Sequence, residues 1–347
     1  MRQGRYIVLC AGLFIAGNFF GGFAAFPAWV YLSLASAAAA IALICRRLPI
    51  MLLTFFLLGA AGLQAGRLPG GEAATPALMQ FASRLQHDFS ASLAAFIPEG
   101  DELAVMRALA IGDKSSLTRD LRRTYRDSGA MHLLALSGLH VGIIYALIAS
   151  ALSVLGNSRP AKAVRSLAIL SFLWFYALIS GLSPSISRAV IMITIFEISG
   201  FVGTKRDGPS SVAASALLIT LFAPEAPRNI GFQLSYSAVI AIYTIYPRLR
   251  PLLQTGSRLL RYIWDSACIA ISCQCTCGVL GWLYFGTFPR YFLLTNILAV
   301  PLATAIMYLT AATMLSVTIP GVSELSARML RGAIHLLNEL LSIIASL

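Results

Sequence analysis

The residues of this sequence that could do chemistry are few, and several stand inside long apolar runs. The stretch MHLLALSGLH, residues 131–140, holds two histidines, a serine and a glycine. Polar side chains that face lipid cost several kcal/mol each. We expect one helix over 131–155, on which these residues share much of one face that must contact protein or water. The predicted polar stripe consists of His132, Ser137, Gly138 and His140.

Three later apolar runs carry polar groups at corresponding depth. These are Ser185 and Arg188 in the run 184–203, Gln233 and Ser235 in the run 230–246, and Asn296 in the run 292–317. An interhelical hydrogen bond would account for each serine, glutamine or asparagine taken singly. Arg188 keeps its charge at every accessible pH, so it needs an acceptor, a water-filled cavity or an anionic substrate. Because the groups share a depth, we interpret them together as the lining of a polar path for an anion.

Other kinds of site are indicated less well. Ser137 and His140 could form a nucleophile and its base, as in an intramembrane hydrolase, but the rhomboid-type G-x-S-G pattern is absent. The sequence has no phosphate loop and no His-x-His metal motif. Cys273 and Cys277 share a helix face, yet a metal cluster would need ligands from another helix. We therefore expect no catalytic residues, no metal site and no cofactor.

Long apolar segments must position these side chains. The 347 residues are 58% hydrophobic and 12% charged, which is too apolar for a soluble surface. About 20 apolar residues suffice for a helix to cross ~30 Å of hydrocarbon, so we predict an all-α, polytopic integral membrane helix bundle with about 10–11 transmembrane helices. The predicted spans are 6–26, 28–45, 48–66, 131–155, 163–182, 184–203, 209–223, 230–246, 266–285, 292–317 and 327–347. The short run 209–223 and the run with Pro301 could each be a broken helix.

Basic residues gather in alternate loops between these spans. This segregation predicts a cytoplasmic N-terminus and an extracytoplasmic C-terminus. The formal net charge of +12 then follows largely from topology, and by itself it does not indicate nucleic-acid binding.

The segment 67–130 interrupts the apolar runs and is predicted to lie outside the cytoplasm. Apolar residues from Leu78 to Ile97 recur at helical spacing, which predicts an amphipathic helix on the bundle or in the outer membrane interface. A basic stripe that could touch phosphates follows it, although interleaved aspartates also favour a salt-bridged, solvated face. The stripe is formed by Arg119, Arg122, Arg123 and Arg126. We divide the chain into N-terminal transmembrane helices (1–66), this extracytoplasmic linker, and a transmembrane channel domain (131–347).

Four ordered motifs resemble those of the ComEC-type competence proteins, the inner-membrane DNA-uptake channels of transformable bacteria. They are LAIGDKSSLTRDLRRTYRDSGAMHLLALSGLHVGIIYAL (109–147), PSISRAVIM (184–192), NIGFQLSYSAV (229–239) and FGTFPRYFLLTNILAVP (285–301). The resemblance implies a channel in the bacterial inner (plasma) membrane that passes one strand of incoming DNA into the cytoplasm. It implies that the polar stripe and its counterparts on the later spans line the DNA path. The four arginines would lie where DNA enters.

Larger members of that family carry an OB-like extracellular domain and a metallo-β-lactamase-like nuclease domain. We expect neither here, because the linker 67–99 is short and lacks strand alternation, and the sequence ends after the last span. The resemblance therefore implies that the chain is not an enzyme and that a separate nuclease, a DNA receptor and a cytoplasmic helicase-like ATPase act with it. A transporter or scaffold for another anionic, envelope or lipid-linked substrate is the alternative function. A homodimer around a shared path is compatible with the same sequence.

Overall fold

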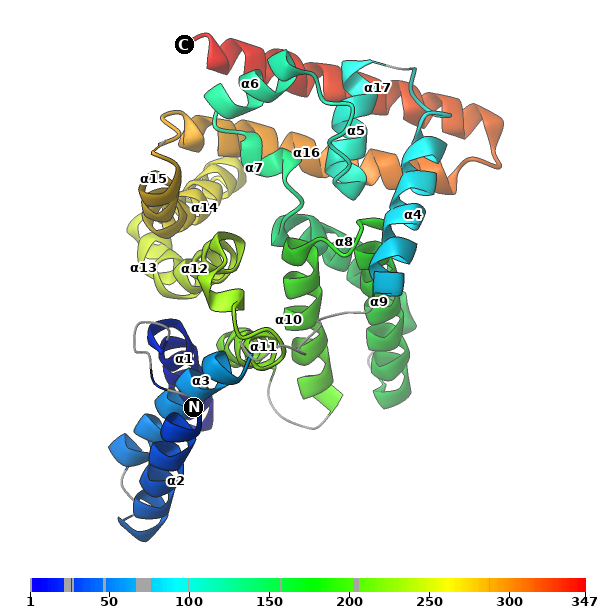
Figure 1. The fold of residues 1–347 in the computed structure, drawn as a ribbon. Coiled ribbons are helices and arrows are strands. Elements are labelled where there is room, and N and C mark those ends of the chain that lie inside the picture. The colour runs from blue at the N-terminus through cyan, green and yellow to red at the C-terminus, as the bar shows by residue number, and fades with distance from the viewer. Residues whose placement is uncertain are drawn as a thin grey trace. The chain divides into compact units, whose positions relative to one another are not determined.

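Helices make up all the regular structure in the part of the chain that the structure describes. This computed structural model (Figure 1) describes residues 2–21, 26, 28–45, 48–66, 76–98, 100–156, 158–201, 206–286 and 288–347. Its described residues contain no strand, which confirms the predicted all-α class. They group into two compact units, the first made of Met1–Thr75 and Arg188–Ile240, the second of Pro76–Ser187 and Ala241–Leu347. The three segments predicted along the sequence stay a prediction, since the units group helices by contact.

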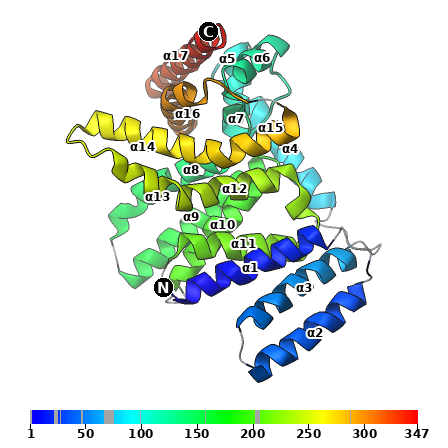
Figure 2. The ribbon, with the colours of Figure 1, turned by 90° about the vertical axis from the view of Figure 1, so that its left-hand side faces the viewer.

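Three N-terminal helices form a layer within the first unit. They are α1 (Arg2–Phe20), α2 (Ala28–Cys45) and α3 (Leu48–Gly66). Figure 2 shows α3 between α1 and α2, and α1 also contacts α11 (Gly208–Phe222). The unit further contains a short 3-10 turn, η2 (Ala226–Arg228), and most of α10 (Pro184–Phe201) and α12 (Ile230–Thr244).

Two glycines bring the backbones of α1 and α3 close together. A Cβ atom added to Gly59 would lie 1.8 Å from the Phe14 carbonyl oxygen, and one added to Gly17 would lie 1.8 Å from that of Phe56. Membrane helices use small residues in this way, because close backbone approach increases van der Waals contact where lipid offers no hydrophobic driving force. The glycines therefore set the spacing of these two helices.

We expect Gly59→Ala to lower the free energy of unfolding by about 2 kcal/mol, because the added methyl group forces the two backbones apart. The matched control is Gly12→Ala, since a Cβ at Gly12 meets nothing within 4 Å. That change is expected to be neutral or slightly stabilising, because alanine favours a helix. Thermal unfolding of the two purified variants in detergent measures the difference, and equal melting temperatures would contradict the close approach.

The second unit is built around the helical pair α16 (Phe292–Leu315) and α17 (Pro320–Ala345). Figure 1 shows α17 alongside α16, with α5 and α6 against α17. The helix α4 contacts α5 and α9, and α14 contacts α16. The remaining elements are α4 (Pro76–Leu93), α5 (Asp101–Ile111), α6 (Arg119–Asp127), α7 (Met131–Leu134), α8 (Gly138–Ala151), η1 (Leu152–Leu155), α9 (Arg159–Ile179), α13 (Tyr246–Leu249), η3 (Arg250–Leu252), α14 (Arg258–Cys273), the π-helical η4 (Gln274–Gly278) and α15 (Val279–Phe285).

Several helices in both units begin where the sequence offers a capping side chain. Thr118 accepts a hydrogen bond from the Leu121 N–H at the start of α6, and Asp207 accepts one from the Ser210 N–H at the start of α11. Such caps satisfy backbone donors that the first helical turn leaves without partners. The ends of these helices therefore follow from local sequence.

Within the part of the chain that the structure describes, four helices, all in the second unit, are long and apolar enough to cross a membrane. They are Gly138–Leu155, Arg159–Ile179, Arg258–Phe285 and Phe292–Leu315. Shorter apolar helices cover Ile7–Phe20, Val30–Ala39 and Gly208–Phe222 among the described residues. The chain is therefore a membrane protein with a helical bundle, whereas the larger count of about 10–11 spans stays a prediction.

Several predicted spans differ from the helices observed among the described residues. The span 131–155 is not one helix, because Ala135 and Ser137 have extended backbones that separate α7 from α8. The helix through 266–285 already begins at Arg258, and α16 continues unbroken through Pro301. The last helix is amphipathic and starts at Pro320, seven residues before the predicted span.

Candidate functional site

The helix α6 presents the predicted basic stripe on the surface of the second unit. Its arginines are exposed and surround an open hollow of about 490 Å³. The lining residues are Arg119, Asp120, Arg122, Arg123, Arg126 and Met131. The structure thus brings all four predicted arginines to one place. Four arginines and two aspartates leave α6 with a net charge of +2.

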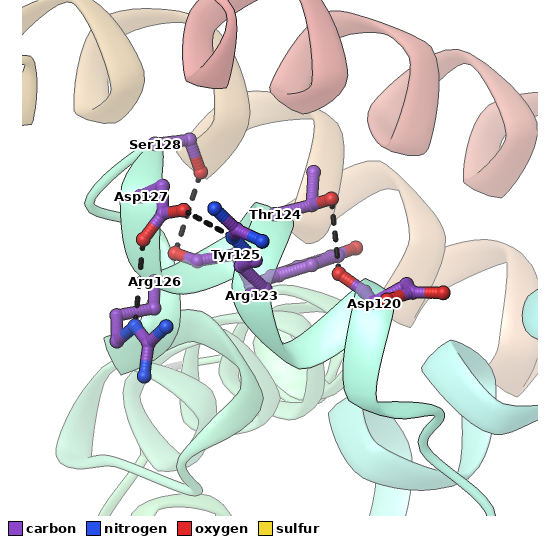
Figure 3. Close-up of polar contacts among 7 residues, drawn as sticks. All are labelled: Asp120, Arg123, Thr124, Tyr125, Arg126, Asp127 and Ser128. Atoms are coloured by element: carbon purple, nitrogen blue, oxygen red, sulfur yellow. Dashed lines mark hydrogen bonds and ion pairs between the residues drawn. The ribbon is translucent and has the colours of Figure 1, made fainter.

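Intramolecular partners neutralise this hollow only weakly (Figure 3). Arg123 and Arg126 each place Nε 3.4 Å from a carboxylate oxygen of Asp127. Both pairs are solvent-exposed, and exposed pairs contribute at most about 1 kcal/mol. Arg122 instead donates to the Lys114 carbonyl oxygen at 2.7 Å. Burial, together with the positive charge of Arg122, lowers the pKa of Lys114. The hollow therefore keeps positive charge that an external anion could neutralise.

The hollow has a rigid support behind α6. Tyr125 is fully buried on the inner face of α6, and its hydroxyl donates to Asn338 Oδ1 of α17 at 2.9 Å. Burial, with a smaller contribution from the charge of Asp101, raises the pKa of Tyr125. Thr295 of α16 donates to the Ser128 carbonyl oxygen at 2.6 Å. These contacts fix α6 against both long helices, and the sequence offered no local signal for either.

The turn between α5 and α6 contains Asp113, a carboxylate that hydrogen bonds hold in place. Ser90 of α4 donates to its Oδ2 at 2.5 Å, and the Ser115 hydroxyl donates to its Oδ1 at 2.7 Å. Burial would raise the pKa of Asp113, but these hydrogen bonds and the charge of Arg107 outweigh burial and lower the pKa from 3.8. The carboxylate therefore ties α4 to the turn that leads into α6.

We expect Asp113→Asn to lower the free energy of unfolding by about 1 kcal/mol at neutral pH, a modest loss because solvent screens the partly exposed group. A carboxyl whose pKa is lowered by folding stabilises the protein above its unfolded pKa, and the contribution is lost as pH falls through its folded pKa. The gap between wild type and variant should thus shrink below pH 3.8. Thermal unfolding across this pH range tests it, with Asp127→Asn as the exposed control. A gap that is constant with pH would contradict the assignment.

The predicted stripe at 131–140 consists of the short helix α7, a link over residues 135–137 and the first turn of α8, and its first part contacts α16. His132 Nδ1 lies 3.0 Å from the Gly129 carbonyl oxygen, and the Asn296 side chain hydrogen-bonds to the same ring. Gly129 has a φ of +79°, and a Cβ there would lie 3.1 Å from the Pro289 side chain. Thr295 and Asn296, which are consecutive residues of α16, therefore bind Ser128 and His132 on either side of Gly129. The structure thus brings together His132 and Asn296, which were each predicted as residues of the path.

Ser137 and His140 meet in a different way from the prediction. Ser137 is the N-cap of α8, and its N–H and Oγ lie 3.3 and 3.1 Å from His140 Nδ1. The pair is a capping box that starts α8 next to Gly138, so it is not part of a stripe on one continuous helix. The buried His140 also interacts electrostatically with His132. This capping role accounts for both side chains without a hydrolytic one.

The first unit holds a separate polar group around Arg188. Arg188 is 8% exposed as a whole residue, and its Nη2 atom donates to the Gly231 carbonyl oxygen at 2.9 Å. The Nε atom has no hydrogen-bond partner, and no ion pair joins Arg188 to a carboxylate among the described residues. Glu197, nine residues along α10 and so on the opposite face of that helix from Arg188, pairs with Arg206 at 2.8 Å.

The other predicted residues have ordinary structural partners or partial exposure. Gln233 Nε2 donates to the Pro227 carbonyl oxygen at 3.0 Å, and Ser235 is half-buried on α12. Ser185 is half-buried in the first turn of α10, in the second unit. Tyr236, a residue that the sequence did not single out, lies 3.1 Å from Ser215 through their hydroxyl oxygens and interacts electrostatically with Arg188. A single path that joins these residues to His132 stays a prediction.

Residues 109–347 match the family model described as "Competence protein". The chain is 32% identical to ComE operon protein 3 of Bacillus subtilis (strain 168) over 142 residues, which are 41% of this chain and 18% of that protein. It is 32% identical to competence protein ComA of Neisseria gonorrhoeae over 147 residues, 41% of this chain and 21% of that protein. Its likeness to the uncharacterized protein YcaI of Escherichia coli (strain K12) is 25% over 215 residues, with shares of 58% and 28%. The matched parts span less than a third of each relative, and no solved structure matches.

Proposed function

The chain belongs to the competence-protein family, and on this premise we propose that it forms the membrane channel that passes single-stranded DNA into the cytoplasm during natural transformation. Two of its relatives are named as a ComE operon protein and a competence protein. The chain itself would supply the path, with no catalytic step.

The observation that carries this proposal is the buried guanidinium of Arg188. A buried charge without an opposite charge costs several kcal/mol. Here one carbonyl oxygen accepts from Nη2 while Nε stays without a partner. A phosphate group would provide both the negative charge and the additional acceptors. We therefore place the phosphodiester backbone of the passing strand next to Arg188.

The hollow on α6 supports the same substrate class from the outside. Its arginines keep a surplus of positive charge, and α6 is held rigidly by Tyr125 and Thr295 contacts. Basic side chains attract a nucleic acid through its phosphates and release condensed counterions. We propose that DNA first contacts the chain here. His132, Ser137, Gly138, His140 and Asn296 would then border the path close to α6, and Ser185, Gln233 and Ser235 would do so near Arg188.

The proposal also covers the location and orientation of the chain, the proteins that act with it and its oligomeric state. The chain would lie in the bacterial inner membrane with its N-terminus in the cytoplasm and its C-terminus outside. A separate nuclease, a DNA receptor and a cytoplasmic helicase-like ATPase would supply strand degradation, capture and driving force. Two copies could share one path as a homodimer.

A second candidate substrate follows from the chemistry of the same arginines, which recognise phosphate and carboxylate rather than DNA as such. An anionic envelope or lipid-linked substrate would satisfy Arg188 equally well. A transporter or scaffold for such a molecule is therefore the alternative.

Labelled DNA distinguishes the two functions. We expect a strain without this chain to bind DNA at the surface but to accumulate the label outside the inner membrane, and we expect the intact chain to restore cytoplasmic label. A control strain that carries the chain but lacks the DNA receptor should fail at binding. Normal internalisation in the deletion strain, together with an altered envelope composition, would overturn the DNA proposal in favour of the alternative.

A further inference from the structure

The bend between α13 and α14 contains a hollow that the proposed DNA path does not use. It lies wholly in the second unit and has a volume of about 380 Å³. Its walls include Arg250, Leu253, Thr255, Arg261, Trp264 and Asp265. Charged, aromatic and aliphatic side chains therefore meet within one small concavity.

Specific hydrogen bonds hold the walls of this hollow in place. Arg250 Nε donates to Asp265 Oδ1 at 3.0 Å, and the Trp264 indole N–H donates to the Arg250 carbonyl oxygen at 3.1 Å. Arg261 Nη2 donates to the Thr255 carbonyl oxygen at 2.9 Å. Because side chains of α14 lock the preceding turn on both sides, the hollow is preorganised for a ligand.

The hollow and the bend around it carry an excess of positive charge, of which the lining residues Arg250, Arg261 and Asp265 contribute +1. The segment 246–265 contains four arginines and one aspartate, a net charge of +3. Arg250 forms an ion pair with Asp265. Neither Arg258 nor Arg261 forms an ion pair with a carboxylate in the part of the chain that the structure describes. Anions are therefore the ligands that this concavity favours.

The length of the helix places the hollow at the edge of the membrane. Residues Arg258–Phe285 form an apolar helix of 28 residues, which Figure 2 shows as one continuous rod through α14 and α15. At ~1.5 Å per residue it is about 42 Å long, whereas the hydrocarbon layer takes about 30 Å, or 20 residues. The charged residues of this helix, Arg258, Arg261 and Asp265, all lie within its first eight residues, so we assign the surplus to that end, in the headgroup layer. Trp264 and Tyr262 have the amphipathic rings that are enriched at that depth.

Exposed leucines on the same bend favour lipid over other anions. Leu252 is 71% exposed and Leu259 is 69% exposed. Neither leucine lines the hollow, but each is close in sequence to residues that do, so a ligand with acyl chains can contact them while its phosphate lies in the hollow, which a free phosphate cannot do. An acyl chain and a phosphate occur together in a phospholipid.

We propose that this hollow binds the headgroup of an anionic phospholipid. Its phosphate would lie at Arg261 of the lining and at Arg258, which is outside the lining but one helical turn earlier on the same face of α14, and its acyl chains would lie against Leu252 and Leu259. Bound lipid would fix the depth of α14 in the membrane. The site is independent of the DNA path, so either proposal can fail while the other stands.

Native mass spectrometry of the full chain in uncharged detergent tests this site, with phosphatidylglycerol and phosphatidylcholine as the titrated lipids. We expect the wild type to prefer phosphatidylglycerol. In Arg258→Gln/Arg261→Gln its affinity should fall about fivefold for each arginine removed. Arg159→Gln/Arg165→Gln at the start of α9 removes the same charge outside the hollow and should change the affinity less than twofold. Arg258→Gln alone carries the test if the double variant does not fold, because Arg261 then keeps its bond to Thr255.

Three results would overturn the proposal. An equal loss in the α9 control would assign the binding to general charge attraction. Displacement of the lipid by excess inorganic phosphate would assign the hollow to a free anion. A single-stranded oligonucleotide whose binding depends on Arg258 and Arg261, with lipid affinity unchanged in the variant, would make the hollow a nucleic-acid surface.

Discussion

Arg188→Gln is expected to lower the internalisation of transforming DNA about hundredfold while the amount and stability of the protein stay close to those of the wild type. Removal of one member of a desolvated charge pair costs about 3 kcal/mol, and 1.36 kcal/mol corresponds to a factor of ten. Stability should change little, because glutamine can still donate to the Gly231 carbonyl oxygen and the variant no longer buries an unpaired Nε. Transformation frequency and a thermal melt of the purified variant give the two readouts.

Two further variants distinguish a functional role from a structural one. Arg188→Lys keeps the charge and should restore part of the uptake, although it loses the two-pronged geometry of the guanidinium. Arg159→Gln removes an exposed arginine at the start of α9 and should leave uptake unchanged. Full uptake by Arg188→Gln at normal protein level would remove Arg188 from the path. A large loss of stability would instead make it a structural residue.

The second large effect is expected from the arginines of α6. The triple change Arg119→Gln, Arg123→Gln and Arg126→Gln leaves Arg122 in place, because that side chain holds the Lys114 carbonyl oxygen. Each phosphate contact to a single strand contributes about 0.7 to the slope of log affinity against log salt, so the slope should become shallower by about 2. Binding of a labelled single-stranded oligonucleotide to the purified chain over a salt series measures this change.

Variants that remove negative charge rather than positive charge provide the control for this experiment. Asp120→Asn raises the net positive charge of the hollow, and Asp127→Asn, beside it, releases Arg123 and Arg126 from their ion pairs. Both should strengthen oligonucleotide binding. An unchanged salt slope in the triple variant would show that α6 does not contact the DNA backbone, whatever happens to uptake.

Local sequence was sufficient for the class of this protein and for most of its helices. The apolar lengths of α8, α9, α14 to α15 and α16 identify membrane-spanning segments, since crossing hydrocarbon is a requirement on length and composition alone. Helical spacing predicted α4 within the linker, and capping residues such as Thr118 mark helix starts. The four arginines of α6 share a hollow because three- and four-residue steps place them on one helix face.

Long-range contacts settled the features that local periodicity cannot specify. Apolar spacing over 131–155 is compatible with one helix, whereas the structure has a break at Ala135, next to the residues where Asn296 of α16 hydrogen-bonds to His132. The bond from Tyr125 to Asn338 joins residues 213 positions apart, so no window of sequence contains it. The surroundings of Arg188 are likewise made by a carbonyl of another helix. Composition and spacing set what each segment can form, whereas its partners depend on which segments fold against each other.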